Sequence, residues 1–252
     1  MKKVLITGAA GVIGTILRRE LSDRYELRAL DRKRIPRFES VAANLAKGGR
    51  RADRAFAGCD AVVDLAGVAA VDTPWEVVRR NNIPATMNTL EAASRHGVAR
   101  VVYASSNHVT GLYERDDPYA RIVAGDYAGL EPGGFRRITI ADPIRPDGPY
   151  GLGKAFGEAA ARYYADERGL SAVCLRIGTC KGSDRPERPR DFATLLTHGD
   201  LVRLVVAALE APDSVRFGTF YGVSANTWRF WEIDDACEAI GYEPADDAEQ
   251  FR

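Results

Sequence analysis

The feature of this sequence that most constrains its fold is a glycine-rich turn that follows the first apolar run. Residues 3–7 are apolar and β-branched, which is typical of a buried strand. Small residues fill 8–14, and 15–21 has the spacing of an amphipathic helix. A second apolar run, 27–30, ends at Asp31. This order of strand, turn, helix and strand predicts the first unit of a parallel α/β sheet.

The same turn predicts a site for a dinucleotide. Small residues let backbone N–H groups approach a pyrophosphate, which then faces the positive end of the helix dipole. An acidic residue at the tip of the next strand accepts hydrogen bonds from the adenosine ribose and repels a 2′-phosphate, so Asp31 favours NAD. Glycine turns alone are common, and the flanking elements make this one specific. The expected cofactor residues are Gly8, Ala10, Gly11, Val12, Ile13, Gly14, Asp31 and Arg32.

Composition narrows the class of protein. The chain has 252 residues, of which 46% are hydrophobic, enough for one large α/β domain or one domain with a small lobe. Its formal net charge of +0 argues against general affinity for nucleic acid or for an anionic membrane. The four cysteines have no metal-ligand spacing, and no apolar run has the length of a membrane span. We therefore expect no metal site, free thiols, and a cytoplasmic protein without a signal peptide.

Strands and helices alternate along the rest of the chain. Further strands are expected at 61–67, 101–106, 172–178 and 218–223, and helices at 75–96, 150–168, 198–209 and 231–240. This pattern predicts a Rossmann-type doubly wound parallel sheet with ligands at the carboxyl ends of its strands. We expect residues 1–178 to form the NAD-binding domain and residues 179–252 to form a small C-terminal substrate lobe. The irregular segment 112–149 is long for a loop and is either functional or a lid.

A tyrosine and a lysine one helical turn apart carry the predicted chemistry. Tyr150 and Lys154 begin the helix 150–168 and lie on one face of it. A free tyrosine is a poor base at neutral pH, but a neighbouring ammonium stabilises its phenolate. A hydroxyl from a strand end, that of Ser106, can hold the substrate oxygen. Together the three side chains can take a proton from an alcohol while a hydride leaves its carbon for a nicotinamide.

These motifs resemble those of the extended short-chain dehydrogenases/reductases of the epimerase/dehydratase type. The resemblance covers nearly the whole chain and rests on Thr7–Gly14, Asp31, Leu65–Gly67, Ser105–Ser106 and Tyr150–Lys154. It implies Tyr150 as the base, Lys154 as the partner of the ribose and the phenolate, and Ser106 as a hydroxyl donor. It also implies a homodimer or higher homo-oligomer. Besides Tyr150 and Lys154, the cofactor contacts that it implies are Asn44, Leu45, Leu65, Ala66, Gly67, Asn82 and Ile177.

Within that superfamily the chain is most similar to the uronate dehydrogenases, which oxidise the anomeric carbon of a pyranose hexuronate to an aldarolactone with NAD. The similarity lies in Ser105–His108, Arg145–Gly151, Arg176–Cys180 and Ser224–Asn226. It implies that Arg190, eight residues before His198, holds the sugar carboxylate, which a guanidinium fork binds through two hydrogen bonds. It also implies that a small acidic sugar contacts Ser106, Asn107, His108 and Thr179.

A second family within the superfamily is a close alternative. In the segments 112–149 and 218–231 the chain looks like archaeal NAD-dependent glucose-6-phosphate dehydrogenases. That chemistry is also anomeric oxidation, with a phosphate in place of the carboxylate. Arg185, Arg188 or Arg190 could serve either anion.

Two other classes remain as alternatives. A nucleotide-sugar epimerase or dehydratase would need a larger C-terminal lobe than the roughly 70 residues that follow the sixth strand. A non-catalytic NAD-binding regulator would usually have lost Tyr150 or Lys154, and both are present. One departure affects the narrower resemblance, because Ala69–Ala70 stands where uronate dehydrogenases have a serine.

Overall fold

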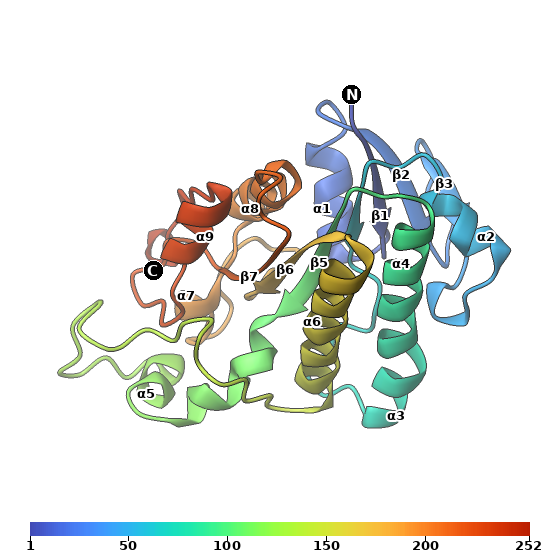
Figure 1. The fold of residues 1–252 in the computed structure, drawn as a ribbon. Coiled ribbons are helices and arrows are strands. Elements are labelled where there is room, and N and C mark those ends of the chain that lie inside the picture. Colours follow the sequence, from blue (N-terminus) through green and yellow to red (C-terminus); the bar gives the residue numbers. More distant parts are fainter.

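The fold is built around a seven-stranded parallel sheet, in a computed structural model that describes all 252 residues (Figure 1). The strands are β1 (Lys3–Thr7), β2 (Glu26–Asp31), β3 (Glu39–Ala42), β4 (Ala61–Asp64), β5 (Arg100–Ser106), β6 (Ser171–Ile177) and β7 (Phe217–Gly222). The helices are α1 (Val12–Glu20), α2 (Arg50–Asp53), α3 (Trp75–Val77), α4 (Ile83–Arg95), α5 (Tyr119–Ala124), α6 (Pro149–Arg168), α7 (Asp191–Thr194), α8 (His198–Glu210) and α9 (Asp234–Ile240). The strand order β3-β2-β1-β4-β5-β6-β7 confirms the predicted doubly wound sheet.

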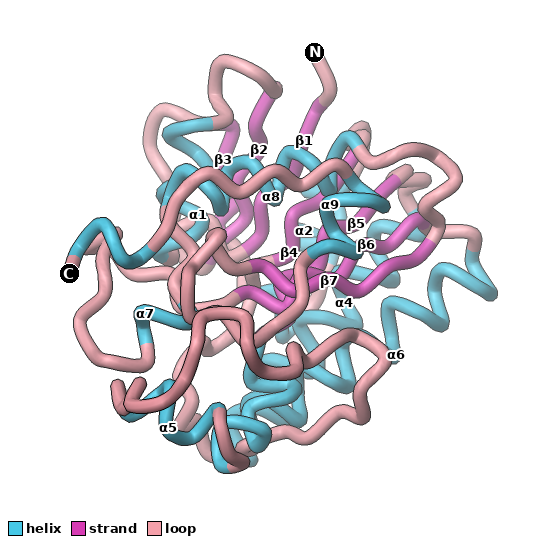
Figure 2. The backbone as a smooth tube through the Cα atoms, turned by 90° about the vertical axis from the view of Figure 1, so that its left-hand side faces the viewer, coloured by secondary structure: helices cyan, strands magenta, loops and turns pink.

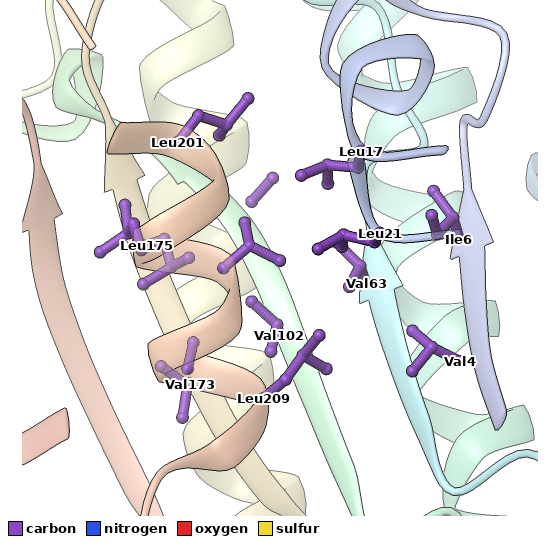
Figure 3. Close-up of a cluster of buried hydrophobic side chains, with 14 of the residues drawn as sticks. Val4, Ile6, Leu17, Leu21, Val63, Val102, Val173, Leu175, Leu201 and Leu209 are labelled. Carbon is purple, nitrogen blue, oxygen red and sulfur yellow. The ribbon is translucent and has the colours of Figure 1, made fainter. Parts of the chain in front are cut away.

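The central strands are apolar on both faces because helices cover both. In β1, Val4 and Ile6 point to one face and Leu5 to the other, and all three are fully buried. Leu17 of α1 and Leu201 of α8 pack against the first face, as Figure 3 shows. Helices α4 and α6 cover the second face. None of the helices combines the length and the apolar character that crossing a membrane requires.

The parallel arrangement places the carboxyl ends of all seven strands at one edge of the sheet. The chain order reverses at β1, which pairs with both β2 and β4. At such a switch point the loops that follow neighbouring strands diverge, and ligands bind between them. Figure 2 shows the strands enclosed by helices and the long loops gathered around α5 and α7. This edge therefore carries the candidate site.

The insertion and the residues after β7 share a small apolar cluster. Tyr119 and Ile122 of α5, a helix inside the segment expected to be irregular, pack with Phe230 and Trp231. The backbone N–H of Ile138 donates to the carbonyl of Phe230 at 2.7 Å. By contrast, β7 and α8 extend the sheet and one of its helical layers. The small lobe thus draws on two parts of the chain, and a domain boundary at residue 178 stays a prediction.

Two helices differ from the expectation for physical reasons. The last helix begins at Asp234 rather than at Trp231, because the backbone of Trp231 pairs with Ile138 in a β-bridge. The helix expected at 75–96 contains a π-helical turn, Val78–Asn82. Pro84 follows this turn and has no N–H to donate one turn back, which disturbs a regular α-helix.

Candidate active site

Three backbone segments meet at the turn after β1. Gly8 has a φ of +62°, and a Cβ on it would lie 2.6 Å from the carbonyl oxygen of Leu65. A Cβ on Gly14 would lie 2.7 Å from the Cα of Ala9. The absence of a side chain at Gly8 lets the turn touch the end of β4, and the same absence at Gly14 lets α1 start against the turn.

The N-terminus of α1 is open to an anion. Its N-cap is Gly11, which has no side chain to pair with the free backbone N–H groups, and the first turn contains no acidic residue. Val12 is 51% exposed, so this turn faces solvent. Unpaired N–H groups and the helix dipole favour a negative charge here. The turn therefore fits the pyrophosphate of a dinucleotide, with Ala10 and Ile13 on either side of the cap.

Asp31 lies at the carboxyl end of β2 and is held against the glycine turn. Its Oδ2 accepts a hydrogen bond from the N–H of Ala10 at 3.0 Å, and its Oδ1 accepts one from the N–H of Lys33 at 3.2 Å. The carboxylate is thereby placed beside the pyrophosphate position, where the adenosine ribose is expected. Arg32 is exposed at the same strand end.

Two expected cofactor residues use their side chains on the protein itself. Asn44 follows β3 and caps a short 3-10 turn, because its Oδ1 accepts from the N–H of Ala46 at 3.0 Å. Asn82 holds the backbone of Val68 with two bonds, accepting from its N–H at 2.8 Å and donating to its carbonyl at 3.0 Å. Both asparagines support loops at the edge of the sheet, and direct contact of either with NAD stays a prediction.

Buried and backbone groups line the rest of the expected cofactor groove. The N–H groups of Leu65 and Ala66 both donate to the Thr7 hydroxyl at 3.2 Å, which joins the ends of β1 and β4. Leu45 and Ile177 are each 6% exposed. Contact of these residues with NAD stays a prediction.

Tyr150 and Lys154 lie side by side in the first turns of α6. They are 8% and 7% exposed. The Lys154 ammonium donates to the carbonyl of Ala104 in β5 at 2.5 Å and lies 5.8 Å from the centre of the Tyr150 ring. It also lies 4.9 Å from the centre of the Tyr103 ring. The bond to β5 and the two rings hold a positive charge where it can stabilise a phenolate.

Three polar residues at the end of β5 face the same edge. Ser106 is paired in register with Ile177, and its Oγ accepts from the N–H of His108 at 3.2 Å. Asn107 is 2% exposed, and its Nδ2 has no hydrogen-bond partner. The ring centre of His108 lies 6.0 Å from that of Tyr150. The strand end thus brings polar side chains to the tyrosine, and a buried donor without a partner is typical of a ligand site.

Sequence reasoning missed the partner of His108. The Nδ1 of this histidine lies 2.5 Å from Oδ2 of Asp147. Because a carboxylate accepts and does not donate, Nδ1 is the donor of this bond, and Nε2 is the ring nitrogen left for a ligand. Asp147 lies within the motif Arg145–Gly151, which supports the family resemblance, and its position there could have pointed to it as a residue of the site.

Arg190 lies at the same edge, but its guanidinium is already paired. Its Nε and Nη2 donate to the carboxylate of Glu114 at 2.6 and 2.7 Å, and its Nη1 donates to the hydroxyls of Thr179 at 3.0 Å and Thr194 at 3.3 Å. Burial disfavours the charged guanidinium, but the bonds and charge of Glu114 outweigh burial and raise the pKa of Arg190. The other arginines of 181–191 are exposed.

A buried ion pair fixes α6 against the sheet and was also missed. Arg176 of β6 donates to Glu158 of α6 at 3.0 and 2.9 Å, and the Ser105 hydroxyl donates to the same carboxylate at 2.5 Å. Burial opposes the charge of Arg176, but Glu158 more than compensates and raises its pKa. Glu158 follows Lys154 by one helical turn, so the pair sets the position of the lysine. The one-turn spacing of Lys154 and Glu158 in the sequence could have pointed to Glu158 as a residue of the site.

Comparisons with known proteins agree with this geometry. The sequence model of the NAD dependent epimerase/dehydratase family matches residues 4–199. The uronate dehydrogenase of Agrobacterium fabrum is 35% identical, over 100% of this chain and 88% of its own length. Two Haloferax volcanii proteins, an NAD-dependent glucose-6-phosphate dehydrogenase and an L-arabinose 1-dehydrogenase (NAD(P)(+)), are 33% and 32% identical. Each alignment covers 98% of this chain, with 95% and 98% of the respective relative.

The solved structures show the same relationship. A variant of the uronate dehydrogenase from Agrobacterium tumefaciens, in complex with NAD, matches this chain with a TM-score of 0.82 at 34% identity. The match covers 100% of this chain and 88% of the other. The resemblances stated from the sequence are therefore confirmed at the level of family, fold and cofactor.

Proposed function

Because this chain belongs to the NAD-dependent epimerase/dehydratase family and is an NAD-dependent sugar dehydrogenase, we propose that it oxidises the anomeric carbon of a pyranose sugar to a lactone. The observation that carries this proposal is the placement of Tyr150 beside Lys154 at the carboxyl edge of the sheet. An acidic sugar, a hexuronate that yields an aldarolactone, is the first candidate substrate. The names of the relatives support it.

The residues of this chain perform the proton half of the reaction. The turn 8–14 and Asp31 hold NAD, which when bound accepts the hydride from the anomeric carbon. Tyr150 takes the proton of the anomeric hydroxyl as the hydride leaves, so that oxygen becomes the carbonyl of the lactone. Lys154 keeps a positive charge beside the phenolate. Ser106 donates a hydrogen bond to the reacting oxygen.

The neighbouring polar groups orient the sugar ring. Nε2 of His108 binds one sugar hydroxyl, because Asp147 holds the other ring nitrogen. Asn107 donates through the amide nitrogen that lacks a partner. Arg190 faces the exocyclic group of the sugar, with Thr179 beside it. Orientation of this kind brings the anomeric carbon and its acceptor into reacting distance.

Other substrates compete with a hexuronate. Glucose-6-phosphate would present a phosphate to Arg190, in keeping with the name of one Haloferax volcanii relative. A neutral aldose is favoured by a specific observation, because Glu114 already neutralises Arg190. A nucleotide-sugar epimerase or dehydratase is the remaining alternative within the family. It would need room for a nucleotide diphosphate next to the small lobe.

The experiment that tests the proposal is a substrate panel. The protein is mixed with NAD and, separately, with galacturonate, glucuronate, galactose, L-arabinose or glucose-6-phosphate, and the absorbance of NADH is followed. We expect reduction with at least one of these sugars and a lactone as the first product by NMR. Absence of NADH with every sugar would favour the epimerase alternative, in which the hydride returns to the sugar and NAD undergoes no net reduction.

We also propose a homodimer formed through α6 and located in the cytoplasm. Leu152, Phe156 and Tyr163 of α6 are 50%, 40% and 51% exposed, a large apolar area for the surface of a helix. A second copy of the chain, packed helix to helix, would cover them. Size-exclusion chromatography with light scattering tests this, since Phe156→Glu should then convert dimer into monomer.

A further inference from the structure

The guanidinium of Arg190 has almost no donors left for a substrate. An arginine has five N–H groups, one on Nε and two on each Nη. Two of them donate to Glu114 at 2.6 and 2.7 Å, in the bidentate geometry that a guanidinium makes with a carboxylate. Two more reach the hydroxyls of Thr179 and Thr194 at 3.0 and 3.3 Å. One N–H remains, whereas an incoming carboxylate needs two parallel donors.

The pair of Glu114 and Arg190 is enclosed. The side chains are 14% and 18% exposed. A solvent-exposed pair would yield readily to a competing anion, but an enclosed pair is less screened by water. Glu114 belongs to the 3-10 helix Asn107–Arg115, which begins with the polar residues at the end of β5. The competing carboxylate is therefore carried by the same segment that is expected to contact the sugar.

Neither of the neighbouring carboxylates accepts a hydrogen bond from the Arg190 guanidinium; each is held through one oxygen by another side chain, and its second oxygen is buried without a partner. Asp147 is bound by His108 at 2.5 Å, and Asp191 by the ammonium of Lys181 at 2.5 Å. Arg190 is thus the cation that Glu114 neutralises. An acidic sugar would have to expel Glu114 from the fork, whereas the hydroxyl of a neutral sugar can accept from the one remaining N–H.

We propose that Glu114 is a specificity-determining residue that occupies the anion position of the sugar site and disfavours acidic sugars relative to neutral pyranoses. This inference rests on the proposed function, since it requires that Arg190 faces the sugar. Galacturonate and galactose provide the matched pair of substrates. They share the ring and its hydroxyls and differ only in whether carbon 6 is a carboxylate or a hydroxymethyl group.

The test is the variant Glu114→Gln, which keeps the shape and an acceptor oxygen but removes the charge. At saturating NAD we expect KM for galacturonate to fall by about tenfold or more, and KM for galactose to change by less than about threefold. Asp116→Asn is the control, because Asp116 pairs with Arg145 at an exposed position two residues away. It should leave the ratio of the two KM values unchanged. An unchanged ratio in Glu114→Gln as well would overturn the inference.

A second readout separates this inference from the chemistry. Binding of galacturonate and of galactose to the NADH complex is measured by calorimetry, which needs no turnover. Tighter galacturonate binding by Glu114→Gln without activity on any sugar would support the role of Glu114 while rejecting the proposed reaction. No gain in binding would reject the role of Glu114. If Glu114→Gln loses its cooperative thermal unfolding, Glu114→Ala is measured in its place.

Discussion

The two halves of the ligand-binding edge are built in different ways. The centre of the nucleotide half is contiguous, because the turn 8–14 and Asp31 follow one another in β1, α1 and β2 (Figure 1). The sugar half joins distant residues: Arg190 contacts Glu114, 76 positions away, and His108 contacts Asp147, 39 positions away. One half therefore depends on backbone geometry, and the other on side-chain pairs that exist only in the folded chain.

This difference shows which half can change its ligand. In the nucleotide half a side chain at Gly8 or Gly14 would collide with backbone, so these positions cannot be substituted without moving the turn that faces the ligand. In the sugar half, one side-chain pair can be exchanged while the base and the cofactor groove stay in place. In agreement, relatives of nearly equal identity are named for three different sugar substrates.

The largest expected effect on activity comes from removing the Tyr150 hydroxyl, which lies between the two halves. Tyr150→Phe should lower kcat by about 10²–10⁴-fold or more, because it removes the proton acceptor and leaves the rest of the site in place. NAD affinity, measured by titration of protein fluorescence, should hardly change. Tyr163→Phe, at an exposed position on the same helix, serves as the control. A Tyr150→Phe enzyme that retains its activity would place the base elsewhere.

A change confined to the nucleotide half should raise KM for NAD and not KM for the sugar. In Gly8→Ala the new methyl group would meet the carbonyl of Leu65 at 2.6 Å, and we expect KM for NAD to rise by about tenfold or more. Gly97→Ala is the matched control, because Gly97 also has a positive φ, of +68°, but no atom within 4 Å of the new methyl group. Equal effects from both variants would show that backbone strain, and not the close approach, is responsible.

A change confined to the sugar half should raise KM for the sugar and not KM for NAD. Arg190→Ala leaves the charge of Glu114 without its partner, so KM for galacturonate should rise by about tenfold while KM for NAD stays within about twofold. Arg188→Ala removes an exposed arginine of the same loop and should change neither value. If Arg190→Ala raised both KM values equally, Arg190 would not touch the substrate, and the division between the two halves would fail.

The smallest effect tests whether the small lobe has a pH response of its own. Burial raises the pKa of Asp235 in α9 to about 6, above its value of about 3.9 in an unfolded chain. A raised pKa in the folded state means that the contribution of this carboxyl to stability is fully present below about pH 4 and is lost as pH rises through about 6. The free energy of unfolding, measured in urea at several pH values, should therefore fall between about pH 4 and about pH 6 by roughly 1 kcal/mol less in Asp235→Asn than in wild type. Asp234→Asn, at the exposed neighbouring position, is the control. An identical pH dependence of stability in wild type and Asp235→Asn would contradict the raised pKa of Asp235.

The sequence predicted the parts of the site that depend on nearby residues. The glycine turn and Asp31 were found because they lie within one strand-helix-strand unit, and the spacing of Tyr150 and Lys154 followed from the period of a helix. Ser106 was found because it ends an apolar strand. Each of these signals is readable because neighbours in sequence remain neighbours in space.

The pairs between distant segments could not be predicted in this way. Glu114 was one charged residue in an irregular segment, and nothing in its sequence neighbours pointed to Arg190. The parallel sheet, the nucleotide turn and the position of the base could be predicted because they follow from hydrophobic period and backbone sterics. The pairing of Glu114 with Arg190 could be seen only in the folded chain, because it arises from the packing of β5, β6 and α7 against the insertion. The charge available to a substrate is set by that packing.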